Sequence, residues 1–418
     1  MTQQEVCGLL PALKSFLRDF AICFAYQPSR DHLQTYCCGL LADLPRKSVE
    51  PIALQAGTAP RTLQQFLRSF AWDHQNLRDI LQRRIVQRHL PPPGDTPFGS
   101  LGVIGLIDET AVAKKGDQTP GVQRQYCGRT GKIDNCIVTV HLAVLYESFK
   151  AILDGELYLP QDSWAADRDR CHAAQIPQTL VYTPKHLMAL EQVRRAMGNG
   201  VRFDWLTFDE GYGGKPGFLR GLDGLGLLYV GEVPRTLGVW SKLPKYHSHQ
   251  SPFAAKRAEE LARHSPVFRE QPFKRLEIAR QTLASQVWQV KAARVHISVE
   301  GIPTSPRYWL IYARNEATGE KKYFVSNAPE GTRLGRMLRV AFCRAHVEHV
   351  FRISKSELGF GDYEGRSYVG LMRHVYMCQL MLLFVMEQTE RLRKKKSGVD
   401  AGANSACPEV LLSETAEP

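Results

Sequence analysis

Apolar residues recur at helical spacing through the first ninety residues, and few stretches there are typical of strands. Residues 47–73 predict two helices joined by a turn at residues 57–60. The apolar positions that define these helices are Ile52, Leu54 and Ala56, followed by Leu63, Phe66 and Leu67. This outline is typical of a helix-turn-helix, whose second helix can enter the major groove of DNA. We expect a helical DNA-binding domain over residues 1–95, with an ordinary helical hairpin as the alternative.

The pattern changes to strands alternating with helices after a Pro-rich stretch near residue 92. Apolar runs at 101–110, 136–147 and 155–160 predict strands, and a helix and a further strand follow. This order favours an α/β core with a mixed sheet flanked by helices. Residues 236–330 interrupt the alternation and predict antiparallel strands, so we interpret them as a β-rich insertion. The core is then predicted over 96–235 and 331–395, with a disordered tail at 396–418.

The net charge of the chain indicates the kind of molecule that it binds. Lys and Arg number 54 against 42 Asp and Glu, a formal net charge of +12, which indicates a polyanionic partner such as nucleic acid. The 10 cysteines contain no C-x-x-C pair, which removes support for a zinc ribbon or a thioredoxin-like site. The most apolar run, residues 377–386, is too short to span a bilayer and predicts a buried core helix. We expect a cytoplasmic protein that does not insert into a membrane.

Carboxylates occupy three places where a catalytic site is plausible. Asp108 and Asp209 each follow an apolar run, so both are predicted at strand ends, where turn or capping residues are the usual alternative. Residues 341–356 are predicted as part of one long helix, in which Arg344, Glu348 and Lys355 share a face. A solvated salt-bridge face is the alternative there. Three acids with nearby cations suit two Mg²⁺ ions, with Mn²⁺ as a possible substitute, for phosphoryl transfer.

Four further segments narrow the interpretation: LIDETAVAKKG, PGVQRQYCGRTGKIDNC, TFDEGYGG and ELGFGDYEGRSYVGLMRH. Together they resemble insertion-sequence transposases of the DDE superfamily, which have a ribonuclease-H-like core. The related pattern Tyr-x2-Arg-x3-Glu-x6-Lys is matched by Arg344, Glu348 and Lys355, whereas Ala341 stands at the Tyr position. The resemblance implies that Asp108, Asp209 and Glu348 form the catalytic, metal-binding triad. Residues expected to contact DNA are Arg344, Lys355, Arg61, Gln64, Arg68, Lys114, Lys115 and Arg129.

The resemblance also implies an activity. The enzyme would cleave double-stranded DNA at the terminal inverted repeats of a mobile element and transfer the freed 3′-OH to target DNA. Holding two ends requires at least two protomers, so a homodimer is expected in the synaptic complex, associated with the nucleoid when bound to DNA. Two alternatives remain: a catalytically silent DNA-binding protein derived from a transposase, and a two-metal nuclease on the same core.

Overall fold

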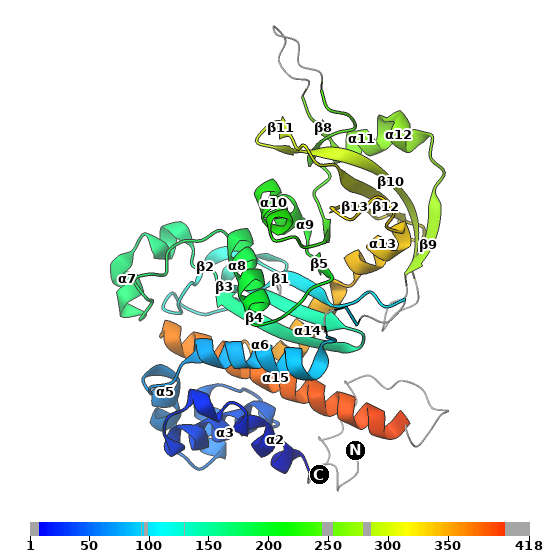
Figure 1. Ribbon diagram of the computed structural model, residues 1–418. Helices are drawn as coiled ribbons and strands as arrows, with labels where there is room; N and C mark the ends of the chain where they lie inside the picture. The colour runs from blue at the N-terminus through cyan, green and yellow to red at the C-terminus, as the bar shows by residue number, and fades with distance from the viewer. Residues whose placement is uncertain are drawn as a thin grey trace.

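A computed structural model describes residues 8–92, 94–95, 99–128, 130–244, 254–278 and 286–397. Arg129 and the expected tail beyond residue 397 lie outside these ranges. The last helix runs from Tyr368 to Ser397, so the first two residues assigned to the tail are helical. The structure has a helical N-terminal part, a five-stranded sheet with helices on both faces, and a second, eight-stranded sheet (Figure 1).

The described residues of the N-terminal part form helices joined by short connections. Its helices are α2 (Leu9–Arg18), the short η1 (Ala21–Cys23), α3 (Gln27–Leu41), α4 (Val49–Gln55), α5 (Pro60–Arg68) and α6 (His74–His89). The predicted hairpin of two helices is present as α4 and α5, and Leu63, Phe66 and Leu67 are buried as expected. Leu54 lies in α4 as predicted but is 64% exposed, and Ile52 and Ala53 are the residues of this helix that are buried.

The first sheet is mixed. Its strands are β1 (Ile104–Ala113), β2 (Gln123–Cys127), β3 (Lys132–Tyr146), β4 (Phe149–Leu157) and β5 (Trp205–Thr207). β3 pairs antiparallel with β1, β2 and β4, whereas β5 pairs parallel with β1. The prediction that Asp108 ends a strand is wrong: β1 continues through five more residues, because Thr110, Ala111 and Val112 extend the ladder with β3.

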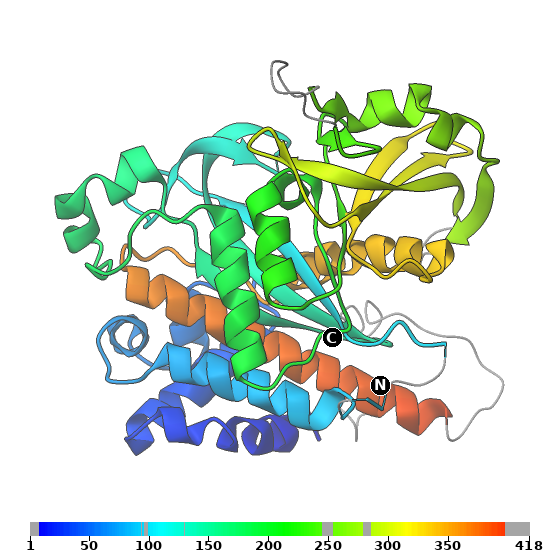
Figure 2. The ribbon, with the colours of Figure 1, turned by 45° about the horizontal axis from the view of Figure 1, so that its top comes forward.

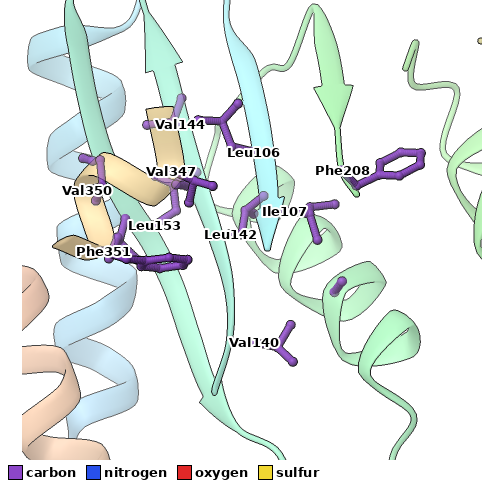
Figure 3. Close-up of a cluster of buried hydrophobic side chains, with 14 of the residues drawn as sticks. Leu106, Ile107, Val140, Leu142, Val144, Leu153, Phe208, Val347, Val350 and Phe351 are labelled. Carbon is purple, nitrogen blue, oxygen red and sulfur yellow. The ribbon is translucent and has the colours of Figure 1, made fainter. Parts of the chain in front are cut away.

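Helices cover both faces of this sheet (Figures 1 and 2). On one face lie α8 (Lys185–Gly198) and α10 (Pro216–Gly224). The shorter η2 (Gln161–Ala165) and α7 (Arg168–Ala173) precede α8, and α9 (Glu210–Gly213) precedes α10. On the other face lie α6, α14 (Ala345–Ser356) and the long α15 (Tyr368–Ser397). Figure 3 shows Val347, Val350 and Phe351 of α14 beside Leu153 of β4. These apolar contacts fix α14 against the sheet, and α14 carries Glu348.

Helix α15 is the predicted core helix. By length and composition its Tyr368–Arg393 stretch could cross a membrane, but 89% of its most apolar window is buried inside the protein. Arg373 of α15 donates to the carbonyl oxygens of Leu67 at 3.0 Å and Phe70 at 2.8 Å, so the helix also anchors the end of α5. The interpretation of residues 377–386 as a buried core helix is confirmed, although the helix extends well beyond that run.

The predicted antiparallel strands are present in the second sheet as β10 (Gln286–Val299), β12 (Tyr308–Asn315) and β13 (Lys321–Ser326). The sheet also contains shorter strands that were not predicted: β7 (Gly238–Trp240), β8 (Lys256–Arg257), β9 (Lys274–Ile278) and β11 (Ile302–Pro303), with α11 (Ala258–His264) and α12 (Pro266–Arg269) between β8 and β9. β13 pairs with β6 (Val230–Glu232), and Tyr229 before β6 bridges Leu206 of β5. The inserted strands therefore continue from the core sheet through β6.

The helix predicted to be continuous around residue 341 is broken. It consists of α13 (Leu334–Phe342) and α14, separated at Cys343 and Arg344. Thr207 of β5 donates to the carbonyl oxygen of Ala341 at 3.4 Å, so the end of α13 lies over β5. α13 packs on β5 and β6, whereas α14 packs on β1 and β4. One straight helix could not reach both surfaces, so the two helices run in different directions. The break places Arg344 at the start of α14.

Candidate active site

Asp108 lies in the middle of β1 with its carboxyl group facing α14. It is opposite His141 of β3, and its side chain is 11% exposed. β5 runs parallel to β1 with Leu106 beside Thr207. Continuing this register by two residues brings Asp209 level with Asp108. The two strands thus bring together acids that are far apart in the sequence.

Asp209 caps the short helix α9. Its Oδ1 accepts hydrogen bonds from the backbone N–H groups of Gly211 at 2.9 Å and Tyr212 at 3.3 Å. These bonds orient the carboxylate at a helix N-terminus, a favourable place for negative charge. The half-buried Asp209 therefore caps α9 and is also a neighbour of Asp108. Its role as a cap does not exclude the predicted role in the site.

Arg344 connects the other two carboxylates. Its Nη1 lies 2.8 Å from Oδ2 of Asp108, and its Nη2 lies 3.0 Å from Oε1 of Glu348. The Glu348 side chain is 61% exposed, whereas the Arg344 side chain is 23% exposed. The guanidinium thus lies between a buried acid from a strand and an exposed acid from the adjoining helix.

The electrostatics of Asp108 show an excess of negative charge. Burial raises the pKa of its carboxyl group to about 7, the Arg344 charge opposes this shift, and the charges of Asp209 and Glu348 add to it. A buried acid whose ionisation is hindered by two other acids is stabilised by a bound cation. Three carboxylates are also the oxygen donors that Mg²⁺ and Mn²⁺ prefer, so the donor set fits a hard divalent ion.

The spacing of the acidic side chains and the position of Arg344 also affect metal binding. Within the described part of the chain, no group of three His, Cys, Asp or Glu side chains lies close enough to hold a metal ion. Arg344 occupies positions around Asp108 and Glu348 that a cation would otherwise share. The Glu348 carboxylate is exposed in the first turn of α14.

Competing carboxylates have other partners. Glu109 points to the opposite face of the sheet, where Oε1 accepts from Lys185 Nζ of α8 at 2.8 Å. Glu210 is an exposed residue in the first turn of α9. Asp204 accepts from the backbone N–H of Val103 at 2.7 Å and fixes the loop before β1. The Glu109–Lys185 pair was not predicted, because its members lie 76 positions apart on elements of different type.

Two predicted DNA-contacting cations bind the protein's own backbone. Lys355 Nζ donates to the carbonyl oxygen of Ala111 at 3.0 Å. Lys114 Nζ donates to the carbonyl oxygens of Gly361 at 2.9 Å and Tyr363 at 2.5 Å. Burial lowers the pKa of Lys114 to about 8. Lys114 is thus half-buried and holds the loop after α14 against the end of β1, and its contact with DNA stays a prediction.

The remaining predicted contacts are distributed over the surface. Arg61 and Gln64 are exposed on α5, and Lys115 is exposed after β1. Arg68 is exposed too, but its Nε donates to Oε1 of Gln175 at 3.1 Å. The structure does not bring α5 into contact with Asp108, and α5 packs instead on α3, α4 and α15. Arg129 lies outside the described residues.

Comparison with known sequences assigns the family. Residues 19–296 match the family described as DDE superfamily endonuclease. The chain belongs to this superfamily. The matched range contains Asp108 and Asp209 and ends before Arg344 and Glu348, so the link between Glu348 and the other acids comes from the structure.

A curated relative gives a narrower comparison for this DDE endonuclease. A protein of Microchaete diplosiphon described as a probable transposase for insertion sequence element IS701 is 28% identical over 338 residues. The alignment covers 79% of this chain and 75% of that protein. It spans more of the chain than the family match does.

Proposed function

We propose that this DDE endonuclease is the DNA transposase of an insertion sequence. It would cut DNA strands at the terminal inverted repeats and join the freed 3′-OH to target DNA. The observation that carries the proposal is the Arg344 bridge, which gathers Asp108 and Glu348 beside the strand that leads to Asp209. The superfamily membership and the similarity to a probable transposase support it.

The strand order supports a ribonuclease-H-like core as part of this proposal. Antiparallel β4, β3 and β1 are followed by parallel β5, and Tyr229 extends the parallel edge beyond β5. We assign residues 96–235 and 331–395 to this catalytic domain, 236–330 to the β-rich insertion and 1–95 to a DNA-binding domain. The exposed α5 residues Arg61, Gln64 and Arg68 would contact phosphates or base edges of the terminal repeats.

Asp108, Asp209 and Glu348 would hold two Mg²⁺ ions, or Mn²⁺ in their place. Bound ions of this kind activate an attacking oxygen and stabilise the leaving oxygen of a phosphodiester. Ionised Asp108 carries the charge needed to hold a cation at the middle of the sheet, and the α9 cap keeps the Asp209 carboxylate oriented. Arg344 can leave Glu348 and present its planar guanidinium to a phosphate.

Lys355 and Lys115 would contribute to DNA binding in different ways. Lys355 lies half-buried beside β1 and adds positive charge near the path of the cleaved strand. Lys115 is exposed next to the end of β1 and would contact flanking DNA. Two DNA ends must be held together for transfer, so the active form would be a homodimer. The protein would act in the cytoplasm, on the nucleoid.

Single substitutions test the catalytic assignment. Asp108→Ala, Asp209→Ala and Glu348→Ala should each abolish Mg²⁺-dependent cleavage of duplexes taken from the DNA flanking the reading frame, while binding to those duplexes persists. Glu210→Ala is a matched control because this exposed acid is adjacent to Asp209, and it should cleave normally. Full metal-dependent cleavage by Glu348→Ala would contradict the assignment.

The same assay separates the alternatives. A wild-type protein that binds the flanking DNA but never nicks it with Mg²⁺ or Mn²⁺ would be a silent DNA-binding derivative. A wild-type protein that cuts the DNA but never joins the products to a target plasmid would be a nuclease.

A further inference from the structure

The β2–β3 hairpin presents two large apolar side chains to solvent. Tyr126 of β2 is 66% exposed and Ile133 of β3 is 62% exposed, and the two residues are direct cross-strand partners. Directly opposed residues of an antiparallel pair have Cβ atoms about 5 Å apart and project from the same face. Tyr126 and Ile133 thus form one apolar projection, which we call the hairpin knob.

The other face of the hairpin is buried. Cys127 and Cys136 have no exposed surface and pack with Ala111 and Val138. The hairpin therefore has an inner face fixed to the core and an outer face that carries the knob.

The start of the hairpin is also anchored. Trp164 Nε1 donates to the carbonyl oxygen of Val122 at 2.8 Å, and Ser163 Oγ donates to Oε1 of Gln123 at 2.8 Å. The Arg170 guanidinium lies 3.9 Å from the Trp164 ring and donates to the carbonyl oxygen of Asp117 at 2.6 Å. Figure 1 shows α7, which carries Arg170, at the same end of the sheet as β2. An element held this firmly can place a side chain in a fixed position.

Positive charge surrounds the knob. Arg124 shares the outer face of β2 with Tyr126, since strand residues two apart point the same way, and it is exposed. Lys115 in the preceding loop is exposed too, whereas the exposed Lys132 is opposite Cys127 and starts from the other face of the hairpin. The nearby acids are the exposed Asp117 and the half-buried Asp134, which pairs with Gln125 in the ladder. An exposed aromatic residue beside cations on a two-stranded ribbon is suited to DNA, whose major groove admits such a ribbon.

We propose that the β2–β3 hairpin enters the major groove of the DNA duplex bound at the active site. The Tyr126–Ile133 knob then contacts base edges, and Arg124 contacts a flanking phosphate. This inference rests on the proposed function, since it takes the bound polymer to be DNA.

The sheet itself sets the expected position of this contact. Five residues of β1 lead from Asp108 to Ala113, which is opposite Cys136, and Ile133 lies three residues farther along β3. At about 3.3 Å per residue the knob lies about 26 Å from Asp108. At about 3.4 Å per base pair this span corresponds to about eight base pairs, so contact is expected at that distance from the cleaved phosphate.

Binding of a fluorescein-labelled duplex from the DNA flanking the reading frame tests the inference, measured by anisotropy in Ca²⁺ buffer. The double variant Tyr126→Ala/Ile133→Ala should bind about tenfold more weakly, whereas Tyr126→Phe should bind like wild type. Ile302→Ala is the matched control, because Ile302 is 66% exposed but lies on the second sheet, and it should also bind like wild type. Methylation protection of guanine N7 should be lost about eight base pairs from the cleavage site in the double variant alone.

Three outcomes overturn the inference. The first is a double variant with wild-type affinity and footprint. The second is equal weakening by Ile302→Ala. The third is normal DNA binding combined with a changed oligomeric state by light scattering, which would make the knob an interface between protein copies. If wild-type protein does not bind or cut the flanking DNA at all, the proposed function itself fails, which is a different result.

Discussion

Arg344 and Asp108 form an ion pair with Nη1 and Oδ2 2.8 Å apart, although the residues are separated by 236 positions. The pair fixes the start of α14 to the middle of β1. Arg344 also holds Glu348, so one guanidinium contacts two of the three proposed metal ligands. A divalent ion that uses both carboxylates must compete with this arrangement.

Arg344→Ala is expected to tighten Mn²⁺ binding by about tenfold, because removing the guanidinium frees the oxygens of Asp108 and Glu348. Isothermal titration well above neutral pH measures the affinity without competition from protons. Cleavage by the same variant should fall, since the proposed phosphate contact is lost. Arg352→Ala, an exposed arginine on the same helix, should leave the affinity unchanged. Weaker Mn²⁺ binding by Arg344→Ala would show that Arg344 does not compete with the ion.

The pKa of Asp108 predicts how stability depends on pH in the metal-free protein. This pKa is about 7 in the folded protein, compared with about 3.9 in an unfolded chain. The folded state therefore holds the proton more tightly, and stability should fall as pH rises from about 4 to about 7, by on the order of 3–4 kcal/mol. Asp108→Asn should lack this contribution. Urea unfolding of both proteins in EDTA across this range measures the difference, and parallel pH curves would contradict the prediction.

A buried ion pair joins α8 to β4. Arg195 Nε lies 2.8 Å from Oδ2 of Asp154, which has no exposed surface, and Nη2 lies 2.9 Å from Oε1 of Glu156. Arg195→Ala leaves the Asp154 charge buried without its partner and should destabilise the protein by about 3–5 kcal/mol. Arg194→Ala removes an exposed pair with Glu191 and should cost less than about 0.5 kcal/mol. Thermal unfolding compares the two neighbours, and equal losses would contradict the argument.

The exposed face of α5 should contribute phosphate contacts. Arg61→Ala should weaken binding to flanking DNA and reduce the salt dependence of the binding constant by about one unit of slope, because one phosphate contact releases about one counterion. Arg202→Ala, an exposed arginine before β5, should leave the slope unchanged. Anisotropy titrations at several salt concentrations provide the slopes. An unchanged slope for Arg61→Ala would favour an ordinary helical hairpin.

The pattern of apolar residues located most elements but not all of their ends. The long antiparallel strands β10, β12 and β13 and the buried helix at residues 377–386 were predicted correctly, because their periodicity is a local property, whereas the shorter β7, β8 and β9 were missed. The end of β1 was not, since the strand continues past Asp108 only because β3 provides a ladder partner as far as Cys136. The break at Arg344 was also missed, because it depends on two separate packing surfaces.

Sequence alone determined the types of residue available for chemistry: three acids, the spacing of Arg344, Glu348 and Lys355, and an excess of positive charge. Only the tertiary structure decided how those groups are used. It paired Glu109 with Lys185, joined Arg344 to two acids, and engaged Lys114 with backbone carbonyls. The physical reason is that spacing along a helix or strand fixes only the direction of a side chain, whereas its partner is set by whichever distant element packs against that face.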